Sequence, residues 1–212
     1  MFNAQWTCLW ATTGPPRMIT LFRSNSVRDA AERAYGRVVD QARRPGFFID
    51  CGVPDTLDGR FELICLHAFL YLHRLKREQP QAAPLGQRFF DTMFADFDRS
   101  LREMGTGDLS VGREIKGMAE AFYGRIAAYE QGLAGDDSVL QPALARNLFG
   151  TAPPTQPRLE AMALYARREA ARLDQQDAAE LLAGQIRFGD PPCTAAVSEA
   201  LSKAVPGAMD KR

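Results

Sequence analysis

The chain has 212 residues, 46% of them hydrophobic and 25% charged, which is ordinary for a globular protein with one sizeable core. Lysine plus arginine and aspartate plus glutamate both number 26, so no overall charge directs the chain toward nucleic acid. The most apolar stretch, residues 61–75, contains charged side chains and histidines and is too short to cross a bilayer.

The cysteines and the first residues of the sequence indicate the cellular compartment in which the protein is expected. Cys8, Cys51, Cys65 and Cys193 form no Cys-x-x-Cys pair and no disulfide framework, which indicates a reducing, cytoplasmic environment. Residues 1–17 have neither a basic start nor a continuous apolar region, so they are not a secretory signal. Met18 is therefore an alternative to Met1 as the start of translation.

Apolar residues recur at helical spacing along most of the chain, and no alternating strand pattern is evident. The spacing predicts helices over residues 26–44, 57–77, 86–104, 108–135, 136–148, 158–173 and 177–183. The sequence therefore predicts an all-α fold, a single-domain bundle of about six to eight helices over residues 24–188. Residues 1–23 are expected to be disordered, and residues 189–212 to form a flexible tail.

One predicted loop, residues 45–56, is unusually apolar. Phe47, Phe48 and Ile49 are too hydrophobic to lie free in water, so we expect all three to pack against the bundle.

Two polar seams repeat every seven residues. Arg60, His67 and Arg74 form one on the helix at 57–77, and Asp91 and Asp98 form the other on the helix at 86–104. The short linker between these helices predicts an antiparallel hairpin. In the register that aligns the seams, Arg74 forms an ion pair with Asp91 and His67 a hydrogen bond with Asp98. The alternative is that both seams face water.

A strip of small residues runs along the helix at 108–135. Gly117, Ala121, Gly124 and Ala128 lie on the side opposite its large apolar residues. Such strips let another backbone approach closely. The preferred interpretation is an internal helix packed there, and the alternative is a helix of a client protein.

No segment of the sequence has the residue spacing that a known catalytic or metal-binding motif requires. His67 and His73 project about 120° apart on one helix and cannot chelate one metal ion. No glutamate precedes a histidine by three residues, as a di-iron site requires. Residues 107–112 are one residue too long for a nucleophile elbow, and Met118 stands where a phosphate-binding loop needs lysine. We therefore expect no enzymatic activity and no cofactor or metal.

Three segments carry a family resemblance. They are VPDTLDGRFELICLHAFLYLHRLK at 53–76, GQRFFDTMFADFDRSLREMGTGDLSVGREIKGMAEAFYGR at 86–125, and AYEQGL at 128–133 followed by DDSVLQPALARNLFG at 136–150. Together they resemble the ubiquinol–cytochrome c chaperone family, over about residues 25–188. The chain is similar to the shorter bacterial branch, which has no mitochondrial presequence and no membrane anchor.

The resemblance implies a function and a surface. It implies a non-enzymatic chaperone that binds cytochrome b, or another respiratory membrane protein, and supports assembly of ubiquinol–cytochrome c reductase (complex III). A small partner protein is implied as well, with at most peripheral contact at the inner face of the cytoplasmic membrane. With the small strip included, the candidate partner-binding residues are Arg113, Lys116, Gly117, Ala121, Tyr123, Gly124, Arg125, Ala128 and Tyr129. The alternative function is a small-molecule or lipid-binding protein with a pocket between its central helices.

Overall fold

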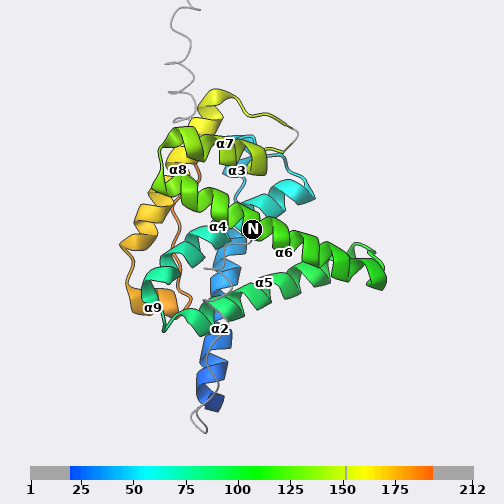
Figure 1. Cartoon of the computed structure of the whole chain (residues 1–212), viewed down its shortest axis with the longest axis vertical. Helices are drawn as coiled ribbons and strands as arrows, with labels where there is room; N and C mark the ends of the chain where they lie inside the picture. The colour runs from blue at the N-terminus through cyan, green and yellow to red at the C-terminus, as the bar shows by residue number, and fades with distance from the viewer. Residues whose placement is uncertain (1–19, 151, 193–212) are drawn as a thin grey trace, which may run out of the picture.

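The computed structural model describes residues 20–150 and 152–192, and all regular secondary structure in these ranges is helical. The elements are α2 (Thr20–Ala42), α3 (Gly46–Ile49), α4 (Leu57–Leu75), the 3-10 turn η1 (Lys76–Glu78), α5 (Ala83–Glu103), α6 (Asp108–Ala134), α7 (Asp137–Leu148), α8 (Gln156–Asp174) and α9 (Ala178–Leu182) (Figure 1). The all-α prediction is confirmed, with eight α-helices in the described ranges.

Helix α4 is the central element. Thr56 caps its first turn by accepting a hydrogen bond from the backbone N–H of Gly59 at 3.1 Å. Helices α2, α6, α7 and α8 all pack against it, so even Glu62, His67 and Arg74 are buried. A helix that is apolar on nearly all sides is expected to lie inside the fold, and α4 does. In the described ranges, no helix is both long enough and apolar enough to span a membrane.

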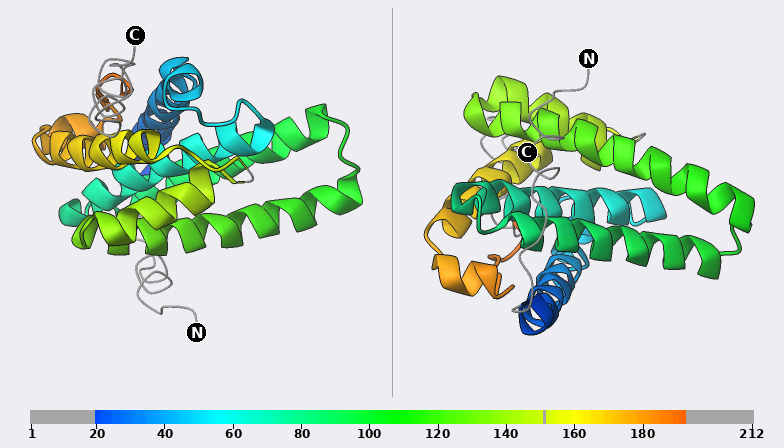
Figure 2. Two further views of the ribbon diagram at one scale, coloured as in Figure 1. Left: turned by 90° about the horizontal axis from the view of Figure 1, so that it is seen from above. Right: turned by 60° about the horizontal axis from the view of Figure 1, so that its bottom comes forward.

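Helices α5 and α6 form a projecting hairpin. They run side by side to a turn at residues 104–107 that stands away from the rest of the chain (Figure 2). Aromatic rings hold them together: Phe90 stacks on Tyr123 at 5.7 Å between centroids, and Phe94 meets Phe122 edge-on at 6.3 Å. We call this pair of helices the arm.

The predicted antiparallel pairing of α4 and α5 is confirmed, but its predicted register is wrong. Phe61 meets Phe97 at 5.3 Å and Tyr71 meets Phe89 at 5.2 Å, so the two helices run in opposite directions. In the register that aligns the polar seams, Tyr71 would instead face Phe94. Large rings fill the space between the helices, and no ion pair joins them there.

The seam residues find other partners. Arg74 donates to the carbonyl of Leu173 in α8 at 3.1 Å and pairs with Glu78 at 2.7 Å. Asp91 accepts a hydrogen bond from Gln87 within its own helix. Asp98 likewise pairs with Arg102, and Arg60 pairs with Asp55 at the surface. The seven-residue spacing identified one face on each helix, but those faces do not meet.

The apolar segment before α4 is only partly buried. Phe47 is fully buried and packs edge-on against the rings of His67 at 5.3 Å and Tyr165 at 5.2 Å. Phe48 is half-buried. The expectation is wrong for Ile49, which is 73% exposed because the single turn of α3 directs it outward.

The ends of the packed chain differ from the predicted boundaries. Helix α2 begins at Thr20, inside the segment that we expected to be disordered. Part of the segment expected in the flexible tail is packed, because the buried side chains of Gln41 and Glu169 bind the main chain of Gly189 and Pro192 is buried. Residues 1–19 and 193–212 lie outside the described residues, so the expectation of disorder there stays a prediction.

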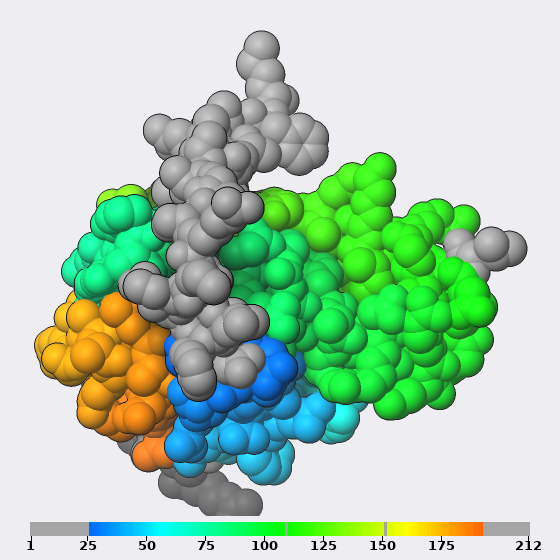
Figure 3. Space-filling model, turned by 90° about the horizontal axis from the view of Figure 1, so that it is seen from below, coloured from blue at the N-terminus to red at the C-terminus, as the bar shows by residue number. Residues whose placement is uncertain are grey.

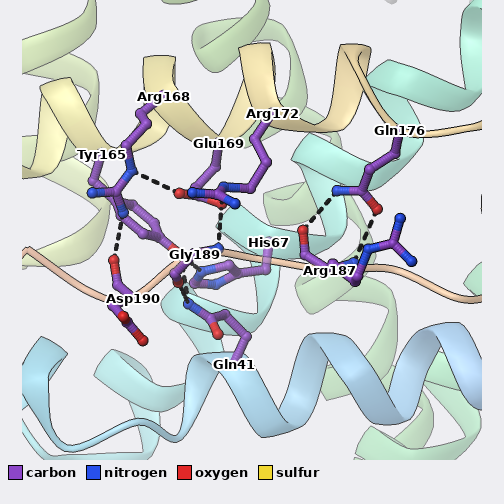
Figure 4. Close-up of polar contacts among 10 residues, drawn as sticks. All are labelled: Gln41, His67, Tyr165, Arg168, Glu169, Arg172, Gln176, Arg187, Gly189 and Asp190. Atoms are coloured by element: carbon purple, nitrogen blue, oxygen red, sulfur yellow. Dashed lines mark hydrogen bonds and ion pairs between the residues drawn. The ribbon is translucent and has the colours of Figure 1, made fainter.

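We call residues 184–192 the strap, because they run extended across α2, α4 and α8 (Figure 4). Gly184 begins the strap with φ +76°, and a Cβ there would lie 2.1 Å from the carbonyl oxygen of Ala30, so only glycine fits. Beyond it Ile186 is buried, and the ring of Phe188 meets that of His67 at 5.1 Å.

Beneath the strap lies a chain of buried hydrogen bonds. His67 Nδ1 is 2.7 Å from the carbonyl oxygen of Leu63, which only accepts, so Nδ1 carries the proton. Nε2 is then the acceptor for the hydroxyl of Tyr165 at 2.7 Å. The Tyr165 oxygen in turn accepts from Gln41 at 2.9 Å. This order of donors requires a neutral imidazole, and burial lowers the pKa of His67 to about 4, against an opposing effect of the Leu63 bond.

The buried imidazole predicts a loss of stability in acid. The pKa is 6.5 in the unfolded chain and about 4 in the folded one, so the unfolded state binds the proton first as pH falls. His67 makes its full contribution to the free energy of unfolding above pH 6.5. This contribution declines toward pH 4, by roughly 3 kcal/mol at most. The free energy of unfolding, measured with urea at each pH across this range, should depend less on pH for His67→Asn than for the parent. The same pH dependence in both proteins would contradict a neutral, buried His67.

The packing of the strap predicts a sharp limit to truncation. A chain ending at Ala183 lacks the buried Ile186 and the ring of Phe188, whereas a chain ending at Pro192 keeps both. We expect the shorter chain to lose on the order of 4 kcal/mol relative to the longer one, from lost apolar burial and hydrogen bonds. Thermal and urea unfolding measure this difference. Equal stabilities would show that the strap contributes nothing.

Candidate partner-binding surface

Among the described residues, the small strip on α6 is uncovered at its two glycines, whereas Ala128 packs against the core. Gly117 and Gly124 are exposed, and Ala121 and Ala128 are partly buried. A Cβ built on either glycine would meet no atom within 4 Å, once the helix's own nearby backbone is left aside. Within residues 20–150 and 152–192, no helix covers these two glycines, so the predicted internal helix is not found among the described elements.

The same helix shows how a small residue permits close packing. At the C-terminal end of α6, a Cβ on Gly132 would lie 2.8 Å from the Leu140 side chain of α7. Helix α7 thus approaches α6 where glycine leaves room for it. Toward the tip of the arm, Gly124 and Gly117 offer the same room, and α7 does not reach them.

Charged residues of the candidate set stand beside the strip. The side chains of Arg113 and Lys116 are each 79% exposed. Their carboxylate neighbours, Glu114 at 3.7 Å and Glu120 at 4.0 Å, make only loose surface pairs. Such pairs contribute little to stability, so both cations remain available to a partner.

Tyr123 lies on another side of α6. It is 39% exposed and stacks on Phe90 of α5. Partial burial, and then the nearby carboxylate of Asp91, raise the pKa of its hydroxyl. Tyr123 thus belongs to the aromatic seam of the arm and shows one edge to solvent.

Two candidate residues face inward. Arg125 Nε lies 2.5 Å from Oε2 of Glu62 in α4, and its guanidinium sits 5.4 Å from the centre of the Phe61 ring. Tyr129 is fully buried and packs on Phe69 at 5.5 Å. Both residues fasten α6 to α4, so neither presents its side chain to a partner on this surface.

Glu62 is the site residue that the sequence analysis missed. It is 6% exposed, and burial raises the pKa of its carboxyl while Arg125 offsets part of the effect. A second pair, Lys76 with Glu130, joins the other end of α4 to α6. A carboxylate among the apolar residues of a buried helix signals a cationic partner, although spacing in the sequence does not identify the helix that supplies it.

The alternative function required a pocket between the central helices. The two best-defined hollows in the described part of the chain both lie away from the space among α4, α5 and α6. The larger, about 650 Å³, is an open groove between α2 and α5. It is lined by Glu32, Tyr35, Gly36, Val39, Asp40, Arg43, Arg88, Asp91, Thr92, Ala95, Asp96 and Arg99. Mixed charges of both signs favour no particular ligand.

Comparisons with known proteins identify relatives. A family model described as "Ubiquinol-cytochrome C chaperone" matches residues 49–188. The chain is 29% identical to ubiquinol-cytochrome-c reductase complex assembly factor 1 of Xenopus laevis over 170 residues, 80% of this chain and 83% of that one. The Mus musculus counterpart is 28% identical over 163 residues, 76% of this chain but 55% of its own length.

A solved structure shares the fold. The crystal structure of the Cbp3 homolog from Brucella abortus matches with a TM-score of 0.71 and 37% sequence identity. The match covers 82% of this chain and 97% of the other. The likeness therefore extends over most of this chain.

The Glu62–Arg125 pair predicts unequal costs for two arginine substitutions on one helix. Arg125→Ala leaves Glu62 buried without its cation, so we expect the free energy of unfolding to fall by about 3–5 kcal/mol. The matched control Arg113→Ala removes an exposed cation and should change it by less than about 0.5 kcal/mol. Urea unfolding of both variants tests the contrast, and similar small losses would show that the buried pair does not fasten α6.

Proposed function

The chain belongs to the ubiquinol–cytochrome c chaperone family, and we propose that it binds cytochrome b through the open flank of α6 during assembly of complex III. The family's role is that of an assembly factor of ubiquinol-cytochrome c reductase, which is not enzymatic. Our proposal adds that the client is cytochrome b and that the flank of α6 binds it.

The observation that supports it is that Gly117 and Gly124, in the small strip, are left uncovered by the described part of the chain. From Gly117 to Ala128 the strip extends about 17 Å along α6, at 1.5 Å per residue. Gly117 and Gly124 have no neighbour within 4 Å of a built Cβ, whereas Gly132 on the same helix is covered by α7. A second helix could continue along α6 where α7 ends.

The chemistry of the strip favours an apolar helix as the occupant. Glycine and alanine keep two helix axes close together, which maximises dispersion contacts along a smooth surface. A membrane-spanning segment of cytochrome b, before it is buried among its neighbours, presents such a helix. The flanking Arg113 and Lys116 would remain in water or meet polar ends of the client.

The fastening of α6 supports the same role. Its inner face is held by Arg125 on Glu62 and by the rings of Phe122 and Tyr129. A helix held in this way presents its outer flank without having to reorder when a client arrives. We place the encounter at the inner face of the cytoplasmic membrane, where a membrane client begins to insert. A small partner protein would bind elsewhere on the chain.

Filling the strip should abolish client binding without unfolding the chain. In Gly124→Leu the new side chain occupies open space, and leucine is the better helix former, so stability should be unchanged or slightly raised. Recovery of cytochrome b with the tagged chain from detergent-solubilised membranes should fall at least tenfold.

The matched control is Gly112→Leu on the same helix. Gly112 is also exposed with nothing within 4 Å of a built Cβ, but it lies outside the strip. It should leave recovery of cytochrome b unchanged. Equal recovery with both variants would reject the strip as the client site, whereas equal loss would point to a general effect of leucine on the arm.

A further inference from the structure

The chain turns sharply from α6 into α7 at residues 132–137, which we call the corner. Helix α6 ends at Ala134 and α7 begins at Asp137, so the two helices form an antiparallel hairpin. The last turn of α6 contains no basic residue, although its final carbonyls carry the negative end of the helix dipole. A cation for this end of α6 must therefore come from another element.

Arg167 of α8 supplies that cation. Its Nη2 donates to the carbonyl oxygens of Gly132 at 3.1 Å and of Gly135 at 2.9 Å, and its Nη1 donates to that of Leu133 at 3.3 Å. Its Nε donates to the carboxylate of Asp137, in the first turn of α7, at 2.9 Å. The side chain is 30% exposed, so these bonds are partly shielded from water. One guanidinium thus joins the end of α6, the start of α7 and α8 (Figure 1).

The direction that α7 takes from the corner decides whether the small strip is covered. At Gly132 a built Cβ lies 2.8 Å from the side chain of Leu140. From Leu140 to its end at Leu148, α7 extends about 12 Å, at 1.5 Å per residue. The same length along α6 reaches from Gly132 back to Gly124, yet no atom of α7 lies within 4 Å of a Cβ built on Gly124. Helix α7 is therefore long enough to reach this glycine and passes beside it.

Apolar packing alone does not select that direction. Leu140, Leu144 and Leu148 bury α7 against the core, but contacts between apolar side chains are non-directional. Hydrogen bonds require defined angles, and a planar guanidinium holds its N–H donors in a fixed arrangement. The bonds from Arg167 therefore constrain the direction of α7 more sharply than its leucines do.

We infer that Arg167 is a positioning residue for the client site, because it holds α7 in the direction that leaves Gly117 and Gly124 uncovered. This inference rests on the proposed function, in which the strip receives cytochrome b. Arg167 lies at the corner, outside the strip, and acts only through α7. Without it α7 takes a range of directions, and the apparent affinity for the client falls with the fraction of chains whose strip is uncovered.

A distance measurement tests the positioning without any client. Spin labels are attached to keto amino acids that replace Glu120 on α6 and Arg146 on α7, so that the native cysteines stay unlabelled. The distribution of distances between the labels should be about twice as wide in Arg167→Ala as in the parent, because the directional bonds at the corner are lost. Arg167→Lys should give an intermediate width, because an ammonium cannot reproduce the fork of the guanidinium. Equal widths in the parent and Arg167→Ala would overturn the inference.

The recovery of cytochrome b with the tagged chain from detergent-solubilised membranes tests the consequence for binding. Recovery should fall at least tenfold with Arg167→Ala, and Arg167→Lys should lie between it and the parent. The control is Leu181→Ala, which opens a cavity at a fully buried residue of α9 and lowers stability. Helix α9 and the arm lie on opposite sides of α2 (Figure 3), so this variant should keep the recovery of the parent.

Failure of the inference can be told apart from failure of the proposed function. Undiminished recovery with Arg167→Ala, shown to be folded by circular dichroism, would overturn the inference and leave the strip as the client site. Equal losses with Arg167→Ala and Leu181→Ala would also overturn it, because lower stability would then explain both. If Arg167→Ala does not fold, Arg167→Lys replaces it in both measurements. If the parent itself recovers no cytochrome b, the proposed function fails, and the distances between the labels decide whether Arg167 directs α7.

Discussion

Three polar side chains on the buried helix α4 determine what packs around it. Glu62 pairs with Arg125 of α6, His67 accepts from Tyr165 of α8, and Arg74 donates to the carbonyl of Leu173 at the end of α8. A buried polar group without a partner costs about 1–3 kcal/mol or more, so these bonds favour one arrangement over other packings of the same apolar surfaces. Helices α6 and α8 are thereby fixed on α4.

The same constraint bears on the surface that we propose for the client. Because Arg125 and Tyr129 hold α6 from within, no described residue covers the flank that bears Gly117 and Gly124. On the α8 side, His67, Tyr165 and Gln41 form the chain of bonds that receives the strap. One buried helix thus supports two separate surfaces, one open and one already occupied.

Much of this could be predicted from the sequence, and the failures share a physical cause. Helical periodicity, caps and glycines located nearly every helix, because those signals are local. The partner of each polar face was not predictable, since a seven-residue spacing is the same for any neighbour and any register. Likewise, a strip of small residues such as Gly117 and Gly124 looks the same in the sequence whether an internal helix or a client covers it. The strap was missed because side chains far away in the sequence, such as Gln41 and Glu169, hold its main chain.

The most direct measurement of the central claim is photo-crosslinking from the strip in membranes that are assembling complex III. A photoreactive amino acid replaces Gly124 in one chain and Gly112 in another, and adducts are identified by mass spectrometry. The account predicts adducts with a membrane-spanning segment of cytochrome b from position 124 and few or none from position 112. Adducts of equal yield from both positions, or none with cytochrome b from position 124, would contradict it.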